Sequence, residues 1–202
     1  MIALAGLIIS VVSVMAVFLV IGIRMPARHE LEVSEEFPYP LDAIYHAVAN
    51  VQAYPQWRTG IVDVEIEGLI NTNDGPRLQF KELGGRRVVS YLVVDDTPPS
   101  RANGRLQLGR RVHRIVGGTL PYRGQWIFGF EPKANSTVLY IIEQAEVPNP
   151  IVRAIGRLFL PPTRNMHQFL IDLRNHLRLG ILETPTSFEM TTRKPTPAEV
   201  LN

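Results

Sequence analysis

The first 23 residues carry no charged side chain, and Arg24 is the first charge in the chain. At 1.5 Å per residue, a helix over this run is about 34 Å long, which exceeds the roughly 30 Å of a bilayer's hydrocarbon core. We therefore predict a single membrane-spanning helix at residues 1–23, joined by a linker at residues 24–28 to ordinary soluble sequence. The bilayer is then an expected partner, which favours a lipid-related ligand for the domain.

Two other interpretations of this apolar run are weaker. A secretory signal peptide would carry Lys or Arg ahead of a shorter apolar stretch and would end in small residues at a cleavage site. Neither feature is present. A buried core helix is the other alternative, but 23 uncharged residues exceed what a small domain needs. Arg24 and Arg28 directly follow the run, so the positive-inside rule places the domain in the cytoplasm.

Composition excludes several classes of site and partner. The chain has no cysteine, so disulfides, thiolate nucleophiles and cysteine-ligated metals are ruled out. The formal net charge is only +2, so we expect no nucleic-acid partner. Several arginines gather in one stretch, where they either meet anionic headgroups or form an ordinary solvated strand surface. They are Arg86, Arg87, Arg101, Arg105, Arg110, Arg111 and Arg114.

The middle of the chain reads as a series of β-strands. Alternation of apolar and polar residues predicts a first strand at residues 29–37, and 3–4 spacing predicts a helix at residues 41–51. Further strands follow, with turns between them at residues 71–76, at Gly84-Gly85 and at residues 95–100. These strands are expected at residues 61–66, 77–83, 86–94, 101–108, 112–116, 122–130 and 137–147.

A long amphipathic helix is expected to close the domain. Asn149 suits the N-cap and Pro150 suits the first helical position. Apolar residues recur at helical spacing from Ile151 to Leu177, and Pro161-Pro162 must kink or interrupt the helix. After Gly180 the chain is rich in Thr and Pro, so residues 180–202 are predicted to be a disordered tail.

This order of elements predicts an α+β domain at residues 29–179. A curved antiparallel sheet folded round one long helix buries the apolar faces of both. Such an arrangement leaves a cavity between sheet and helix wherever the inward side chains do not fill the space.

Three segments in this order resemble a known superfamily. The first comprises residues 40–45, Asn50, residues 54–57 and the strand at residues 61–66; the second comprises residues 120–126 with Phe128, Phe130 and Pro132. The third comprises residues 136–138, Glu143, residues 147–150 and Arg153. They resemble the SRPBCC or START-like superfamily, which includes the polyketide cyclase/dehydrase and lipid-transport proteins.

The resemblance implies the helix-grip fold over nearly all of the soluble part. It leaves the function open, because members bind lipids, hormones or quinones, and a minority catalyse cyclisation or hydrolysis. The apolar first helix, the tail and the Pro161-Pro162 pair lie outside the pattern of the superfamily.

Catalytic motifs are absent from the sequence. No G-x-S-x-G, P-loop, G-x-G-x-x-G or H-E-x-x-H pattern occurs, and the five histidines form no i,i+4 pair, so we expect neither a metal nor another cofactor. If the protein is an enzyme, the candidate acids and bases are His113, Tyr122 and Glu143. Burial habits favour a strand-surface position for His113, and strand alternation favours a solvent-facing position for Glu143.

Aromatic side chains are the expected ligand contacts. In a helix-grip domain the inward aromatics of the sheet line the cavity and offer apolar contact with a few polar tips. The candidates are Trp57, Tyr91, Trp126, Phe128 and Tyr140, and among them we favour Trp126 and Tyr91.

Three functions remain after the sequence analysis. The leading interpretation is a membrane-tethered module that binds a small hydrophobic ligand, lipid- or isoprenoid-like, between sheet and C-terminal helix. The alternative is a cyclase/dehydrase- or hydrolase-type enzyme acting on a hydrophobic substrate. The third is a structural domain whose interior is filled by its own side chains.

Overall fold

The domain is built on one curved antiparallel sheet. In the computed structural model, residues 2–102, 105–159, 161 and 163–183 are described. Seven strands pair in the order β1-β9-β8-β7-β4-β3-β2, every pairing is antiparallel, and β5 pairs with β6 in a separate hairpin. The strands are β1 Arg28–Phe37, β2 Asp63–Thr72, β3 Gly75–Gly84, β4 Arg87–Thr97, β5 Ser100–Ala102, β6 Arg105–Gln107, β7 Gly109–Gly118, β8 Arg123–Pro132 and β9 Thr137–Glu146.

The helices lie before, within and after this sheet. Helix α1 precedes the first strand, and α2, η1 and α3 connect β1 to β2. The last two helices follow β9. Their bounds are α1 Ile2–Arg24, α2 Leu41–Ala49, η1 Val51–Ala53, α3 Tyr54–Trp57, α4 Pro150–Phe159 and α5 Arg164–Glu183.

Strand alternation separates an inner face from an outer face of the sheet. In β1 the buried Val33 and Phe37 point inward, whereas the glutamates between them are outward or only partly covered. In β9 the inward positions are Leu139, Ile141, Glu143 and Ala145, all buried. The inner face therefore carries mostly apolar side chains, as the hydrophobic effect requires, and Glu143 is an exception in β9.

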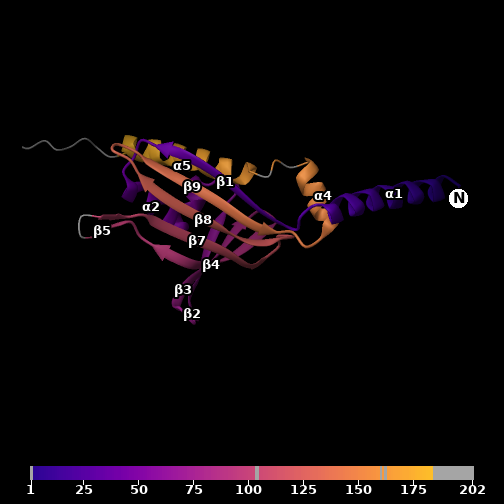
Figure 1. Ribbon diagram of the computed structural model, residues 1–202, viewed down its shortest axis with the longest axis horizontal. Helices are drawn as coiled ribbons and strands as arrows, with labels where there is room; N and C mark the ends of the chain where they lie inside the picture. The colour runs from indigo at the N-terminus through magenta and orange to yellow at the C-terminus, as the bar shows by residue number, and fades with distance from the viewer. Residues whose placement is uncertain (1, 103–104, 160, 162, 184–202) are drawn as a thin grey trace, which may run out of the picture.

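Helix α5 covers this inner face (Figure 1). Its buried residues Met166, Phe169, Leu170 and Leu173 belong to the same core cluster as the inward side chains of the sheet. A sheet and the apolar stripe of one helix thus bury each other, which is the helix-grip arrangement expected from the sequence.

The helix after β9 differs from the expectation of one long, kinked element. Asn149 caps it as predicted, with its side-chain Oδ1 accepting from the backbone N–H of Ile151 at 2.9 Å. The chain then forms two helices, because α4 ends at Phe159 and α5 begins at Arg164. Pro161 lies in the break, and Pro162 lies outside the described residues. Of these two helices, α5 packs on the sheet, whereas α4 packs against α1.

Two other boundaries differ from the sequence-based expectation. The single strand expected at residues 101–108 is instead the β5–β6 hairpin, with residues 103–104 outside the described part of the chain. Helix α5 continues past Gly180 to Glu183, and residues 184–202 of the predicted tail also lie outside it.

Helix α1 projects away from the sheet at the end where β1 begins (Figure 1). Its segment from Gly6 to Arg24 is long and apolar enough to cross a membrane, and only 6% of it is buried within the protein. Several large side chains along α1, including Leu7, Val12 and Val17, are more than half exposed.

Candidate functional site

Two small cavities lie between the inner face of the sheet and α5. The larger has a volume of about 60 Å³ and the smaller about 10 Å³. They share five lining residues, which are Arg58, Glu82, Tyr91, Trp126 and Phe169. The interior beneath α5 is therefore nearly filled by side chains, with a mixed polar and aromatic lining.

The sheet places one row of inward side chains behind these cavities. His113 in β7 pairs with Val93 on one side and with Trp126 on the other. Trp126 in turn pairs with Glu143 in β9. Directly paired residues share a face and lie about 5 Å apart, so the histidine, indole and carboxyl groups form one continuous strip.

A buried ion pair forms the floor of the site. The guanidinium of Arg58 pairs with the carboxylate of Glu82, and their side chains are only 14% and 5% exposed. The same guanidinium lies 4.7 Å from the ring centre of Tyr54 and 5.0 Å from that of Phe169. A desolvated pair of this kind is costly to bury, and it offers a charged anchor beside the aromatic side chains of the lining.

Asp172 fastens α5 over the larger cavity. Its Oδ2 accepts from the backbone N–H of Thr59 at 2.7 Å, and its Oδ1 accepts from the Thr59 hydroxyl at 2.9 Å. Gln168 donates to the same carboxylate at 2.8 Å. All three residues line the larger cavity. Helix α5 is thus held to the segment between α3 and β2 by one buried carboxylate.

Glu143 and Tyr122 are shifted toward their neutral forms. Burial raises the pKa of Glu143 above its usual value, and a hydrogen bond from Trp126 offsets part of this rise. Burial, with the nearby charge of Glu143, raises the pKa of Tyr122 to about 12. In these forms both groups can donate a hydrogen bond or a proton to a polar atom placed near them.

His113 is buried rather than exposed, contrary to the sequence-based expectation. Its ring lies 5.3 Å from Phe80 and 5.2 Å from Phe128, centre to centre. Burial, together with the charges of Arg111 and Arg58, lowers the pKa of His113 well below its usual value. The Nε of Arg111 donates to His113 Nε2 at 2.9 Å, so that nitrogen is the acceptor of a neutral imidazole.

The structure brings together most of the residues singled out in the sequence. Tyr91 and Trp126 line both cavities, Phe128 and His113 line the smaller one, and Tyr122 lines the larger. Glu143 stands next to Trp126 and is buried, so the expectation that it faces solvent is wrong.

Two of the aromatic candidates lie elsewhere. Tyr140 is on the outer face of β9, where its hydroxyl donates to Glu131 at 2.6 Å, so it cannot contact a ligand held beneath α5. Trp57, the last residue of α3, packs against α5, with its ring centre 5.4 Å from those of both Phe169 and His176, and it lines neither cavity. Its Nε1 is buried without a hydrogen-bond partner among the described residues.

Several lining residues were not among the candidates from the sequence, including Arg58, Glu82, Phe169 and Asp172. One signal was available for Glu82, because Leu78, Phe80 and Glu82 occupy alternate positions of one strand. A charge at the end of an apolar alternation marks a buried carboxylate. Arg58 and Asp172 carry no local pattern of this kind.

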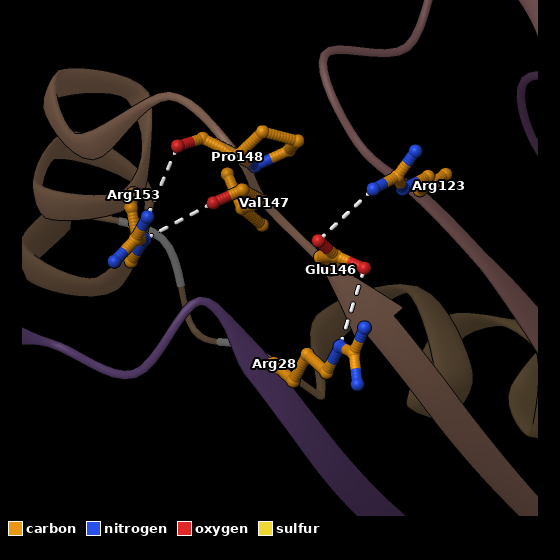
Figure 2. A network of polar contacts seen from close by, with 6 residues as sticks. All are labelled: Arg28, Arg123, Glu146, Val147, Pro148 and Arg153. Carbon is orange, nitrogen blue, oxygen red and sulfur yellow. Dashed lines mark hydrogen bonds and ion pairs between the residues drawn. The ribbon is translucent and has the colours of Figure 1, made fainter.

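A wider groove, of about 600 Å³, lies on the outer face near the base of α1. Figure 2 shows Arg28 and Arg123 reaching Glu146 from two sides, with nitrogen–oxygen distances of 3.3 and 3.1 Å. The groove is lined largely by charged and amide side chains. Besides Arg28, Arg123 and Glu146, these include Glu30, Gln125 and Gln144. This lining suits a polar molecule rather than the apolar surface of a hydrophobic ligand.

Within the described residues, no three His, Asp or Glu side chains come close enough together to hold a metal ion. The titratable groups beneath α5 instead stand singly or in ion pairs, as in Arg58–Glu82.

Comparison with known proteins identifies the fold. No protein-family model and no curated protein matches the chain. Solved structures do: a START superfamily protein from Mycobacterium smegmatis is 19% identical, with a TM-score of 0.54 over 75% of this chain and 98% of that one. The Zhui aromatase/cyclase from Streptomyces sp. R1128 is 14% identical, with a TM-score of 0.55 over 76% and 96%. The protein CC1736 from Caulobacter crescentus has the same identity and TM-score, over 76% and 98%.

These similarities show that the chain has the START-like, or SRPBCC, helix-grip fold. At these identities the comparison concerns the fold alone. The match covers about three quarters of the chain.

Proposed function

We propose that the protein is a membrane-tethered module that holds a small hydrophobic molecule with one polar end beneath α5. The observation that carries this proposal is the position of the cavity mouth relative to α1. We define the mouth by the exposed lining residues Arg87 and Asn165. The larger cavity is lined by Arg87 at the start of β4, Tyr122 just before β8, and Asn165 and Gln168 in the first turns of α5. In an antiparallel sheet these strand ends lie at the same end as Arg28, where α1 joins β1.

The apolar helix α1 supplies the tether in this proposal. Its 23 residues reach about 34 Å, more than the roughly 30 Å of a hydrocarbon core. A core helix would be buried within the protein, whereas only 6% of the apolar segment of α1 is. Arg24 and Arg28 at its C-terminal end favour a cytoplasmic domain by the positive-inside rule. A mouth at this end of the domain then faces the bilayer, from which an apolar molecule can enter directly.

The chemistry of the interior suggests what kind of molecule fits. Phe128, Phe169 and Trp126 offer apolar contact, which contributes about 25 cal/mol for each Å² of ligand surface removed from water. The Arg58–Glu82 pair and the hydroxyls of Tyr91 and Tyr122 offer hydrogen bonds to a carboxyl, carbonyl or hydroxyl group. A fatty acid or an isoprenoid alcohol has both features.

The interior must open before such a molecule can bind. Ligand pockets usually measure about 300–1,000 Å³, and the larger cavity here measures about 60 Å³. We take α5 to be the element that moves, because it is separate from α4 and forms the cover of the cavity, where Asp172 holds it. In this proposal the structure, with α5 held over the small cavity, is the closed state of the domain.

Enzymatic turnover is a second candidate, favoured by Tyr122, which lines the larger cavity, and by the buried Glu143 next to Trp126, because burial raises the pKa of both groups. Similar folds occur in an aromatase/cyclase and in a norcoclaurine synthase that was solved with dopamine and hydroxybenzaldehyde, although identities are 14% and 13%. If catalysis occurs, Glu143→Gln and Tyr122→Phe should lower the rate by about 10²–10⁴, with binding nearly unchanged. If the module only binds, both changes should alter affinity modestly, and Trp126→Ala should weaken binding most.

Photocrosslinking of the full chain in vesicles tests the binding proposal. The probe is a fatty acid that carries a diazirine near its methyl end, placed in phosphatidylcholine vesicles with the inserted protein. We expect labelled peptides to include those with Tyr91, Trp126 and Phe169, in addition to α1. Labelling confined to α1 would mean that the interior stays closed to lipids, as a purely structural domain requires.

A further inference from the structure

Helix α4 is strongly amphipathic and does not contribute its apolar side to the core. At 100° per residue, Ile151, Ala154, Ile155, Leu158 and Phe159 share one face, and Arg153 and Arg157 lie opposite. Only Ala154 of this helix is fully buried. Ile155, Leu158 and Phe159 are 41%, 52% and 66% exposed. A helix with three large, uncovered apolar side chains calls for a partner.

The partner that α4 already has is α1. The two helices meet so closely at Gly22 that a Cβ atom there would lie 1.8 Å from the carbonyl oxygen of Pro150. Farther along, the ring of Phe159 lies 6.2 Å from that of Phe18, centre to centre. The apolar face of α4 is therefore continuous with the exposed apolar surface of α1.

The polar side of α4 fixes this arrangement. Figure 2 shows the guanidinium of Arg153 between the carbonyl groups of Val147 and Pro148, to which it donates at 3.1 and 3.0 Å. It also donates to the carbonyl oxygens of Gly22 at 3.0 Å and Met25 at 2.5 Å. One side chain thus joins the end of α1 to the start of α4 and sets the direction in which α4 leaves the domain.

We propose that α4 lies in the lipid interface, with Ile155, Leu158 and Phe159 inserted into the bilayer beside α1. This proposal rests on the proposed spanning role of α1. Phe18 precedes Arg24 by six residues, so it lies about 9 Å below the level of Arg24 along the helix axis. Interfacial helices bury their apolar faces about 5–10 Å deep. The contact between Phe159 and Phe18 brings the end of α4 to this depth.

The positions of two arginines on and after α4 are consistent with a helix that lies in the lipid interface. Arg157 is exposed on the face opposite the apolar one, and Arg164 is exposed where α5 begins. Both side chains can reach phosphate groups while their helix lies at the acyl boundary. Because α5 follows α4 after a short connection, this placement also holds the first turn of α5, and with it the cavity mouth, against the bilayer.

The absence of cysteine makes the proposal directly testable in the full chain. Single cysteines are introduced as Leu158→Cys on the apolar face of α4, Arg157→Cys on its polar face, and Val12→Cys in the middle of α1. All three sites are exposed, so a spin label should be accommodated without disturbing the core. The labelled proteins are inserted into vesicles of phosphatidylcholine and phosphatidylglycerol in equal amounts. Relaxation by oxygen, which concentrates in lipid, is compared with relaxation by a water-soluble nickel chelate.

We expect the labels at positions 158 and 12 to respond severalfold more to oxygen than to nickel, and the label at position 157 to show the reverse. A lipid response at position 12 with an aqueous response at position 158 would overturn the role of α4 and leave the anchor intact. A response to neither reagent at position 158 would also overturn it, since a protein surface, such as a second copy, would then cover α4. An aqueous response at position 12 would instead refute the spanning helix itself.

Discussion

Arg153 in α4 closes the C-terminal end of α1, because its Nη1 donates to the carbonyl oxygen of Gly22 at 3.0 Å. The last carbonyl groups of a helix have no partner within the helix and need donors from elsewhere. The backbone of the connection adds one more tie, a hydrogen bond of 2.9 Å from the N–H of Val147 to the carbonyl of Ala27. The START-like domain is therefore fastened directly to the apolar helix and is not joined to it by a free linker.

Replacement of Arg153 should loosen this junction. Hydrogen bonds to a charged group contribute about 1.5–3 kcal/mol each, so Arg153→Ala should raise the population of the opened junction by at least roughly tenfold. Tryptic cleavage after Arg24 and Arg28 in the detergent-solubilised chain should accelerate accordingly. Arg157→Ala removes the same charge from the exposed side of α4 and should leave the cleavage rate nearly unchanged. Equal rates in the two variants would contradict the role given to Arg153.

The close approach of α1 and α4 can be tested at a glycine. Gly22→Ala would place a Cβ atom 1.8 Å from the carbonyl oxygen of Pro150, so the two helices must move apart. A disulfide between Phe18→Cys and Phe159→Cys should therefore form more slowly in the Gly22→Ala background. Gly6→Ala is the matched control, since nothing lies within 4 Å of a Cβ atom at that position. Unchanged disulfide formation with Gly22→Ala would mean that the helices do not meet in this way.

Glu143 should make stability depend on pH. Its pKa is raised above 4.5 by burial, so the folded state holds the proton more tightly than the unfolded state. The stabilisation is complete below the unfolded-state pKa and is lost as the pH rises through the folded-state pKa. Glutamine does not ionise, so Glu143→Gln should not lose stability as the pH rises. The variant should therefore match the wild type near pH 4 and be more stable than the wild type at pH 7. Denaturant titrations across this range provide the measurement.

Glu146 on the outer face serves as a control, because its pKa is shifted in the opposite direction and its contribution to stability should change with pH in the opposite sense. A hydrogen bond from Arg123, with further contributions from that charge and from Arg28, lowers the pKa of Glu146. Its stabilisation is present above the unfolded-state pKa and is lost as the pH falls. Glu146→Gln should therefore be less stable than the wild type at pH 7 and approach it in acid. The same sign for both variants would refute the burial of Glu143.

Asp172 should control the rate at which a ligand enters and leaves. Asp172→Ala leaves the N–H and hydroxyl of Thr59 without their acceptor, at a cost of about 1–3 kcal/mol, or a roughly 5- to 150-fold larger open population. Transfer of a fluorescent fatty acid between the chain and vesicles should accelerate by a comparable factor. Asp42→Ala, in the exposed first turn of α2, should have no effect. Transfer at the wild-type rate in Asp172→Ala would exclude α5 as the lid.

The alternation of apolar and polar residues made most of the sheet predictable. It did not predict the burial of two site residues, Glu143 and His113. In β9 both faces are apolar around Tyr140 and Ile141, so the sequence does not reveal which of them points inward. Glu143 then shares the inner face with Ile141, and Tyr140 takes the outer one. His113 stands among arginines and resembles a surface residue, yet Arg111 turns inward with it and pairs with Asp96 at 2.5 Å. An ion pair between residues on neighbouring strands, such as Arg111 and Asp96, depends on the tertiary structure and cannot be predicted from the local sequence pattern.

The last helices show the same limit. Pro161-Pro162 predicted an interruption, and the apolar stripe on both sides of it predicted one element that packs on the sheet. The residues of α4 continue that stripe in sequence, but they pack on α1, because the break frees α4 to take a different direction. Amphipathicity predicts that a helix has a partner; it does not say whether that partner is a sheet, another helix or lipid.

Native mass spectrometry of the full chain, released from detergent without delipidation, tests the central claim most directly. We expect a population that carries one small apolar molecule per chain. Asn165→Trp should reduce that population by filling the cavity mouth, and His167→Trp, on the same helix but outside the cavity lining, should retain it. A ligand-free mass for the wild type, or an adduct that persists unchanged in Asn165→Trp, would contradict binding beneath α5.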